Sequence, residues 1–479
     1  MKRLTLIQQN DSHGHIEPHW ELRWRNGVAE TWRAGGYAHI RAHAERIRNE
    51  CGGACIHVDC GDAIHGTGPA QWTKGAAVVP ALNAVGVELM TPGNWEFGYG
   101  PAVLRERRNE LAFQMIAANV RRAETGAPEF AATDIREVNG LRVAFIGITS
   151  PIVGTTMPQP FGAGLRFLDA LDVLPGIVAA IRQQVRPDLI VLLSHYGFAQ
   201  EVTIARRVDG LDVILGGHTH DVLAEPVVVG RTIITQAGAH GSYLTRLDLE
   251  IANGRVCAFR HELIAVKEDD ECNAAVAEIV EESLRPHRKR TDEPAGETDT
   301  LLHRGTVLES PTDNLITHSY LFSTGAEVAL SHGWRFGTPV PPGQITVGDL
   351  WQMIPTNPEL FTVQLTGNEL RSMLEASLER TFAGDALRQA GGYIMRFAGM
   401  RAVVRLNNPA GHRIQRLEVG ESIAEPDRTY TVVGAGEQSA PQAHERTMSG
   451  VSAIESLRSY LAQHTPVSAA RTHTALVAI

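Results

Sequence analysis

This chain of 479 residues has few cysteines, no long apolar run and no excess of basic residues. Its five cysteines show no dense or regular spacing, which excludes a disulfide-stabilised secreted scaffold. The longest apolar runs, such as Leu189–Leu193, are far shorter than the ~20 residues of a membrane helix. Asp and Glu (54) outnumber Lys and Arg (44), and the net charge of −10 excludes a basic nucleic-acid module. Neither a membrane nor a nucleic-acid polymer is an expected partner.

The composition that remains is typical of a globular protein, with 43% hydrophobic and 20% charged residues. At roughly 100–200 residues per domain, the length allows two to four domains, and we favour two. Met1-Lys2-Arg3 runs directly into Leu4–Ile7, without the apolar stretch or the cleavage site of a signal peptide. As written, the chain is therefore expected to be cytoplasmic, or periplasmic if it is a processed form.

Short β-branched runs alternate with helical patterns through the first part of the chain, which predicts an α/β layered sheet. The predicted strands are Leu4–Ile7, Cys55–Val58, Glu88–Met90, Phe113–Ala117, Val143–Ile148, Leu189–Leu193, Val213–Leu215 and Ile233–Thr235. The predicted helices are Gly75–Val85, Pro101–Leu111, Ala170–Gln184 and Gln200–Val208.

A domain boundary is predicted where a helical stripe ends in a basic run. Residues 270–290 carry this stripe and finish with Arg285–Arg290, and the polar stretch Thr291–Gly296 follows. We therefore expect a first domain over residues 1–268, a connecting helix and linker over 269–296, and a second domain over 297–479. The second domain mixes predicted helices (Asn314–Phe322, Asn368–Arg380) with predicted strands (Glu327–Leu330, Phe361–Leu365, Ala402–Leu406, Tyr430–Val433).

Side chains that bind metals follow five of the strands predicted in the first domain. In open α/β sheets the carboxyl ends of the strands hold the ligand, so these residues can meet although they span about 200 positions in sequence. An Asp-x-His pair and a His-x-His pair can each turn both side chains towards one ion. The candidate metal ligands are Asp11, His13, Asp62, Asn94, His195, His218 and His220.

Seven ligands suit two metal ions. Asp62 is the natural bridge, which leaves one set for each ion: Asp11, His13 and His220, and Asn94, His195 and His218. Mixed oxygen and imidazole ligation fits manganese, zinc or iron better than calcium or magnesium. Two such ions about 3.5–4 Å apart would clamp a tetrahedral oxyanion and lower the pKa of a bridging water. The predicted reaction class is hydrolysis.

These motifs resemble those of the calcineurin-like metallophosphoesterases and, within them, of the 5′-nucleotidase superfamily. The resemblance continues in Gly296–Leu302, Asp313–Thr317, Gly343–Asp349 and Leu365–Leu370. It implies an α/β fold, with a calcineurin-like α/β/β/α sandwich followed by a smaller α/β 5′-nucleotidase C-terminal domain that supplies specificity residues. Arg335 stands where the family places an arginine that faces substrate, and a guanidinium can bind an oxyanion through two hydrogen bonds.

The third motif departs from the family at two positions. The family sequence Gly-Asn-His-Glu-Phe-Asp contains a catalytic His and Asp, and this chain has Gly93-Asn94-Trp95-Glu96-Phe97-Gly98 instead. Trp95 has no tunable pKa and offers an indole N–H and an apolar face to a substrate. His15 and His65 are candidates to replace the lost general acid, and the alternative for each is a loop histidine beside the site. The expected catalytic residues are Asp62, Asn94, Arg335 and His65.

The family's aromatic clamp for a nucleobase is incomplete in this chain. In the nucleotidases the second ring comes from a Gly-Gly-Asp-Gly-Phe/Tyr stretch, for which this chain has Val432–Glu437. Phe361 and Tyr393 lie in the parts of the sequence where the family has its aromatic clamp. They are candidate substrate-binding residues together with Trp95 and Arg335. Phe361 is one position off, and a strand phenylalanine is more often part of the core.

At both departures the sequence resembles that of one branch of the superfamily, the Sox-system thiosulfohydrolases. The stretches that carry this resemblance are Trp72–Gly75, Asn94–Tyr99, Leu330–Gly337 and Gly391–Arg396. That branch uses a dinuclear manganese site to release sulfate from a cysteine-bound sulfane on a carrier protein. A sulfur leaving group of low pKa needs no general acid.

Three functions stay open at this point. The leading one is a hydrolase with two divalent ions, manganese in first place and zinc or iron as alternatives, that cleaves a small-molecule phosphomonoester by attack of a metal-bound hydroxide. The second is Sox-type release of sulfate from a carrier-protein arm, and the third is a catalytically silent metal-binding homologue. The chain is expected to be a monomer or a homodimer.

Overall fold

The computed structural model describes residues 1–440, 445–468 and 475–479. The chain divides into two units, and each is described by itself. Unit 1 comprises Met1–His19 and Arg33–His287, and unit 2 comprises Trp20–Trp32 and Arg288–Ile479. Among the described residues, no helix is both long and apolar enough to cross a membrane.

Two six-stranded sheets form the middle of unit 1. The first has the strand order β16 (Arg255–Ala265), β15 (Tyr243–Ala252), β1 (Lys2–Gln9), β4 (Cys55–Asp59), β5 (Leu89–Met90), β6 (Gln114–Met115). The second has the order β13 (Val227–Val229), β14 (Thr232–Gln236), β12 (Val213–Gly216), β11 (Leu189–Ser194), β9 (Leu141–Ile148), β8 (Thr133–Val138). Strands β1, β4, β5 and β6 of the first sheet run parallel to one another, as do β9, β11, β12 and β14 of the second, which places their carboxyl ends at one edge of each sheet. A short antiparallel pair, β7 (Val120–Arg122) with β10 (Leu165–Phe167), accompanies them.

The two sheets pack face to face through apolar side chains. Leu6 and Val58 of the first sheet share one buried cluster with Phe145 and Val191 of the second. Every residue of β11 is buried, because this strand has a sheet neighbour on each side and a packed layer on each face. A continuous apolar run such as Leu189–Leu193 is what a strand in that position requires.

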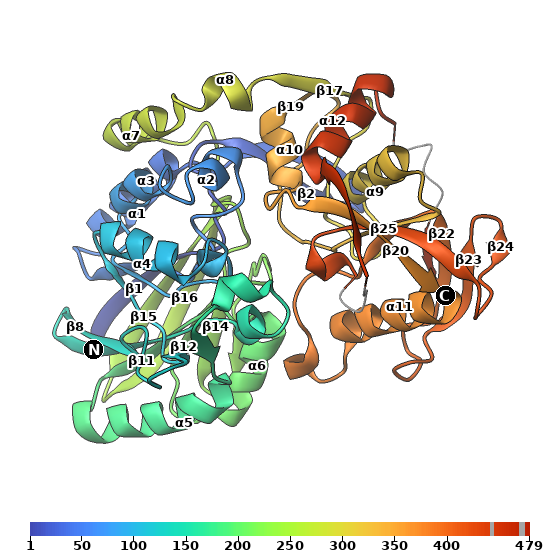
Figure 1. Ribbon diagram of the computed structural model, residues 1–479. Coiled ribbons are helices and arrows are strands. Elements are labelled where there is room, and N and C mark those ends of the chain that lie inside the picture. Colours follow the sequence, from blue (N-terminus) through green and yellow to red (C-terminus); the bar gives the residue numbers. More distant parts are fainter. Residues whose placement is uncertain (441–444, 469–474) are drawn as a thin grey trace. The chain divides into compact units, whose positions relative to one another are not determined.

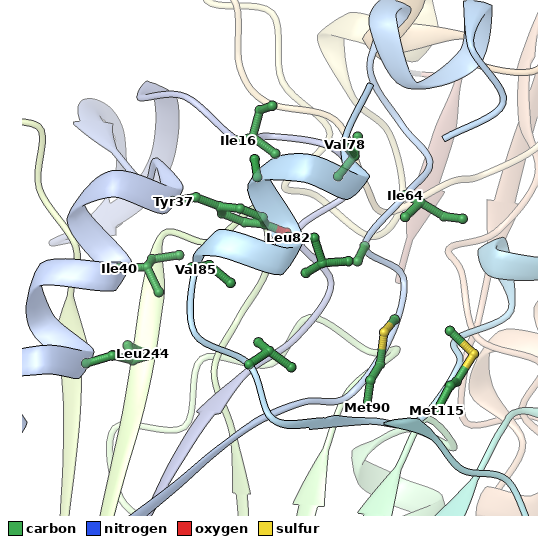
Figure 2. Packing of buried hydrophobic residues seen from close by; sticks show 14 of the residues in the cluster. Ile16, Tyr37, Ile40, Ile64, Val78, Leu82, Val85, Met90, Met115 and Leu244 are labelled. Carbon is green, nitrogen blue, oxygen red and sulfur yellow. The ribbon is translucent and has the colours of Figure 1, made fainter. Parts of the chain in front are cut away.

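Helices cover both outer faces of this pair of sheets (Figure 1). Over the first sheet lie α1 (Tyr37–Glu50), α2 (Gly68–Trp72), α3 (Val79–Ala84), α4 (Pro101–Glu110) and α7 (Ala274–Leu284). Over the second lie α5 (Ala170–Ala180) and α6 (Phe198–Arg207). Figure 2 shows Tyr37, Ile40 and Leu82 of the helical layer packed against Met90 and Leu244 of the sheet. The helix–sheet–sheet–helix layering confirms the predicted α/β/β/α sandwich.

Unit 2 is built on a five-stranded sheet of order β21 (Arg396–Ala398), β18 (Val328–Ser331), β25 (Thr429–Ala435), β20 (Glu359–Thr366), β26 (Thr447–Ser452). A second sheet has the order β24 (Ser422–Ile423), β23 (Ile414–Val419), β22 (Met400–Val404), β27 (Leu476–Ala478), and β17 (Pro294–Thr298) pairs with β19 (Gly343–Thr346). The helices of the unit are α8 (Arg288–Thr291), α9 (Pro311–Thr324), α10 (Val347–Met353), α11 (Gly367–Phe382) and α12 (Ala453–Gln463). Three of them, α10, α11 and α12, begin with a complete capping box, and α11 contains the predicted helix Asn368–Arg380.

The boundaries of the two units fall at residues other than those expected from the sequence. Helix α7 packs into the core of unit 1 through Val276, Val280 and Leu284, so it is part of that unit and not a connector. The hairpin of β2 (His19–Arg25) and β3 (Val28–Ala34) leaves unit 1 almost entirely: residues 20–32 belong to unit 2, where Trp24 meets His303 edge to face at 5.9 Å.

Leu82 tests the packing of the outer helical layer on the first sheet. The Leu82→Ala variant should lose about 2–5 kcal/mol of unfolding free energy, because truncation leaves a cavity around a fully buried side chain. Ile135→Ala, at a side chain that is 39% exposed, is the matched control and should lose less than about 1 kcal/mol. Scanning calorimetry of both variants would show this difference, and equal melting temperatures would contradict it.

Candidate metal centre

The candidate ligands come from the carboxyl ends of five strands of unit 1. Asp11 and His13 follow β1, Asp62 follows β4, and Asn94 follows β5. Three more follow the inner strands of the second sheet, with His195 after β11 and His218 and His220 after β12. Six of the seven side chains are buried and His220 is nearly so. The structure brings all seven into one region of unit 1.

Two sets of ligand atoms form within this region. Those of Asp11, His13 and His220 lie within 4.8 Å of one another, as do those of Asp62, His195 and His218. Asn94 adjoins the second set, since its Oδ1 is 3.2 Å from His195 Nε2. These are the sets that the sequence predicts, and their role as ligands stays a prediction.

The two aspartates each turn one oxygen towards the histidines and anchor the other. Asp11 Oδ2 accepts hydrogen bonds from the His218 backbone N–H (2.9 Å) and the Asn10 amide (2.8 Å). Its Oδ1 faces His220 Nε2 at 3.3 Å and His13 Nε2 at 3.9 Å. A carboxylate oxygen among imidazole nitrogens is a donor set that suits a divalent transition metal.

Asp62 repeats this arrangement. Its Oδ1 accepts the Trp95 backbone N–H at 2.7 Å, and its Oδ2 lies 3.2 Å from His195 Nε2 and 3.9 Å from His13 Nε2. Asp62 Oδ2 is therefore close to a histidine of each set, which agrees with the bridging position that the sequence suggests.

The field at the centre favours a cation. Burial alone would lower the pKa of His195, but the Asp62 and Asp11 carboxylates raise it to about 10. Burial opposes ionisation of Asp11, yet His195 and His220 hold the pKa of that carboxyl well below its usual range. His13 is different, because burial and then the neighbouring His220 lower its pKa, which leaves a neutral imidazole able to donate a lone pair.

A buried glutamate that the sequence analysis did not single out holds the Asp62 loop in place. Glu96 Oε2 accepts the backbone N–H groups of Asp62 (2.8 Å) and Gly93 (2.6 Å), and its Oε1 accepts that of Ala63 (2.7 Å). Burial and the nearby Asp62 raise the pKa of Glu96 to about 7. In the sequence, Glu96 is marked only by its place in the third motif, which does not show what its carboxylate binds.

Residues 290–436 match the family described as "5′-nucleotidase, C-terminal domain". The chain is 23% identical to the 5′-nucleotidase of Vibrio cholerae, over 98% of this chain and 92% of that protein. It is 26% identical to the trifunctional nucleotide phosphoesterase protein YfkN of Bacillus subtilis over 90% of this chain, and it spans 32% of that protein's length.

Two solved structures from Thermus thermophilus resemble the chain throughout. The 5′-nucleotidase precursor has a TM-score of 0.89 at 27% identity, covering 100% of this chain and 99% of that one. The sulfate thiohydrolase SoxB in complex with glycerol has a TM-score of 0.91 at 26% identity, covering 99% and 96%. The chain is therefore an enzyme that is similar to hydrolases of the 5′-nucleotidase family over nearly its whole length. The predicted resemblance is thereby confirmed, and so is the prediction of an enzyme.

Where the third motif departs from the family sequence, a stack of two rings occupies the place of the family's catalytic histidine. Trp95 and His65 are both buried and lie face to face, with centroids 3.9 Å apart and planes 16° apart. Burial lowers the pKa of His65 to about 3, so its imidazole is neutral at pH 7. A general-acid role for His65, which needs the protonated ring near neutral pH, gains no support from this environment.

The remaining predicted residues lie in unit 2. Arg335 is half-buried in the segment between β18 and β19, and Tyr393 is half-buried with the Arg396 guanidinium 5.3 Å from its ring centroid. Phe361 is a correction: it is 1% exposed inside β20, where it belongs to the core. Side chains of a strand point alternately to its two faces, and Phe361 points to the face that is packed in the core. Its ring is therefore buried by the fold and not placed to contact a substrate.

Glu96 should control the shape of the metal centre. In Glu96→Gln an amide NH2 would replace an oxygen that accepts backbone N–H groups, so donors would face donors, at a cost of about 1–3 kcal/mol. We expect a lower melting temperature and weaker manganese binding, measured by calorimetry. Glu124→Gln, at an exposed position, should change neither. Unaltered binding in Glu96→Gln would show that the Asp62 loop keeps its shape without this carboxylate.

Proposed function

We propose that this hydrolase cleaves a nucleotide-like phosphomonoester at the metal centre of unit 1, with two manganese ions. The observation that carries the proposal is the convergence of seven candidate ligand side chains, six of them buried, in two sets. The names of its relatives support the substrate class, since several are 5′-nucleotidases. When bound, two divalent ions supply water of lowered pKa and a clamp for a tetrahedral oxyanion.

The protein's own side chains prepare this chemistry by orientation. His195 donates its Nδ1–H to the Cys60 carbonyl at 2.6 Å, which leaves Nε2 as the ligand atom. Asn94 turns Oδ1 towards the same nitrogen, and the anchored oxygens of Asp11 and Asp62 prevent either carboxylate from rotating away. In unit 2, Arg335 is our candidate for binding the substrate oxyanion and Tyr393 for contacting the rest of the substrate.

The Trp95–His65 stack limits which leaving groups the substrate can have. Neither ring supplies a proton at neutral pH, so the leaving group must depart without a general acid from this position. Loss of such an acid costs about 10²–10⁴-fold for a poor leaving group and less for a good one. An activated phosphate ester should therefore react much faster than an alkyl ester.

A second candidate function rests on the same two rings. A thiosulfohydrolase that releases sulfate from a carrier-bound cysteine S-thiosulfonate has a leaving group that needs no general acid, and the SoxB structure is among the most similar in fold. We place this function second, because several of the similar curated proteins are named for nucleotide substrates.

A panel of substrates separates the two functions. Manganese-reconstituted protein is given AMP, p-nitrophenyl phosphate and a cysteine S-thiosulfonate peptide, and phosphate or sulfate release is measured. We expect phosphate release from AMP and faster release from p-nitrophenyl phosphate. Sulfate release with AMP untouched would replace the first function by the second, and no release from any of the three would overturn both.

The control for this panel is a pair of aspartate substitutions. Asp62→Ala removes a carboxylate that faces both sets of ligands and should lower activity at least ~10³-fold. Asp209→Ala changes an exposed aspartate of unit 1 and should leave activity unchanged. Equal activity of the two variants would mean that the measured hydrolysis does not occur at this centre.

A further inference from the structure

The first sheet of unit 1 ends in a long strand with a free outer edge. Strand β16 has 11 residues, whereas β6, β13 and β8, the other strands that end the two six-stranded sheets, have two, three and six. Among the described residues, neither another strand nor an isolated bridge pairs with the outer side of β16. Such an edge presents N–H and C=O groups that a further strand can join, and proteins therefore tend to keep edge strands short.

The larger part of β16 is regular enough to accept a further strand. Its register with β15 shifts only between Glu250 and Ile251, opposite the first residues of β16. Residues 258–265 pair with β15 without interruption. In this part Phe259 is 42% exposed and the side chain of Arg260 is 75% exposed, so both lie open to solvent. A partner strand could therefore lie along residues 258–265.

Opposite charges already face each other across β15 and β16. Arg260 lies opposite Asp248, and Glu262 lies opposite Arg246. These four side chains share the outer face of the sheet, because Leu247 alternates with its charged neighbours and belongs to the core between the two sheets. Oppositely charged pairs stabilise neighbouring strands, and like charges destabilise them. A strand beyond β16 should therefore place a negative charge beside Arg260 and a positive charge beside Glu262.

A second copy of β16 carries these charges at the required spacing. When two identical strands pair antiparallel about a two-fold axis, one residue lies opposite its own copy, and the residue before it lies opposite the residue after it. With His261 on the axis, Arg260 of each copy lies opposite Glu262 of the other. On the inner face Phe259 then lies opposite Leu263, which adds an apolar contact. No other symmetric register pairs Arg260 with Glu262, and registers centred on either of these residues place like charges together.

We propose that β16 is a dimerisation edge, at which two copies of this chain pair antiparallel about His261. The contact is isologous, since each copy uses the same residues. A single charge on an edge strand deters association, whereas two opposite charges two residues apart admit a strand of matching order and repel others. Burial lowers the pKa of His261, so the rings that meet on the axis are neutral at pH 7. The edge is independent of the proposed function, because the candidate ligands all follow other strands.

Charge reversal and mixing test this edge. In sedimentation velocity, the full-length wild type should show an equilibrium between monomer and dimer. Arg260→Glu and Glu262→Arg should each weaken dimerisation at least about tenfold, because each replaces two attractions across the axis by two repulsions. An equimolar mixture of the two variants should dimerise as the wild type does, since the acidic edge of one then faces the basic edge of the other. The double variant Arg260→Glu/Glu262→Arg should also regain the wild-type affinity.

Arg255→Glu is the matched control. It makes the same change of charge at an exposed residue of β16 before the regular part, and it should not alter dimerisation. Three results would each overturn the edge: a wild type that stays monomeric at about 100 μM, a dimer that both single variants retain, or a mixture of the folded variants that stays monomeric.

Hydrogen exchange gives a second readout that needs no substitution. The amides of β16 should exchange more slowly in the dimer than in the monomer, because the new strand pairing protects them. Unchanged exchange of these amides in a dimer would place the contact elsewhere and overturn the edge. The substrate panel is read separately, so a dimer that hydrolyses none of its substrates would overturn the function and leave the edge standing.

Discussion

The structure depends above all on tight backbone turns at the strand ends, where the ligand side chains leave the sheets. Five of the seven candidate ligands have a positive φ, between 48° and 75°: Asp11, His13, Asp62, His218 and His220. Each such turn costs free energy, and in a non-glycine residue it is found chiefly where function requires a strained conformation. The cost is offset by hydrogen bonds between neighbouring loops. Asp11 N donates to the Gly61 carbonyl, and His13 N donates to that of Asp62.

These turns can form only because glycine stands where the loops approach one another. A Cβ at Gly61 would come within 2.2 Å of the Gly93 nitrogen, and a Cβ at Gly93 within 2.1 Å of Asp62 Oδ1. At Gly217 it would come within 2.9 Å of Asp11 Oδ2. The glycines beside the ligands are therefore part of the metal centre, since any side chain there would push apart the loops that carry the carboxylates. The apolar layer between the sheets supplies the rigid support that such close approach needs.

The sequence predicts that these side chains converge because its signal is simple: a buried parallel strand reads as an apolar run, and the candidate ligand follows the last apolar residue. The run Leu189–Leu193 before His195 is an example. The antiparallel strands β15 and β16 were not predicted. Strand β16 is the edge strand of the first sheet, and it exposes charged residues such as Arg260, which hides its strand pattern. Glu96 was not singled out for another reason. Its role follows from the backbone N–H groups that its carboxylate accepts across the fold, and no local pattern encodes those contacts.

The substitution of Trp95 for the family histidine is best understood together with its neighbour. Gly98 replaces the family aspartate, and its small size leaves room for the rings, since a Cβ there would meet His65 Cδ2 at 3.3 Å and Trp95 Cε3 at 3.2 Å. Tyr99 adds a third ring, with its centroid 5.6 Å from that of His65 and its hydroxyl donating to the Ile64 carbonyl. Both departures from the family motif thus serve one packed aromatic group. A side chain that exchanges protons has been replaced by an apolar wall, while the seven candidate ligands are all present. Under the proposed function, this combination would preserve a hydrolytic centre and restrict it to leaving groups that depart unaided.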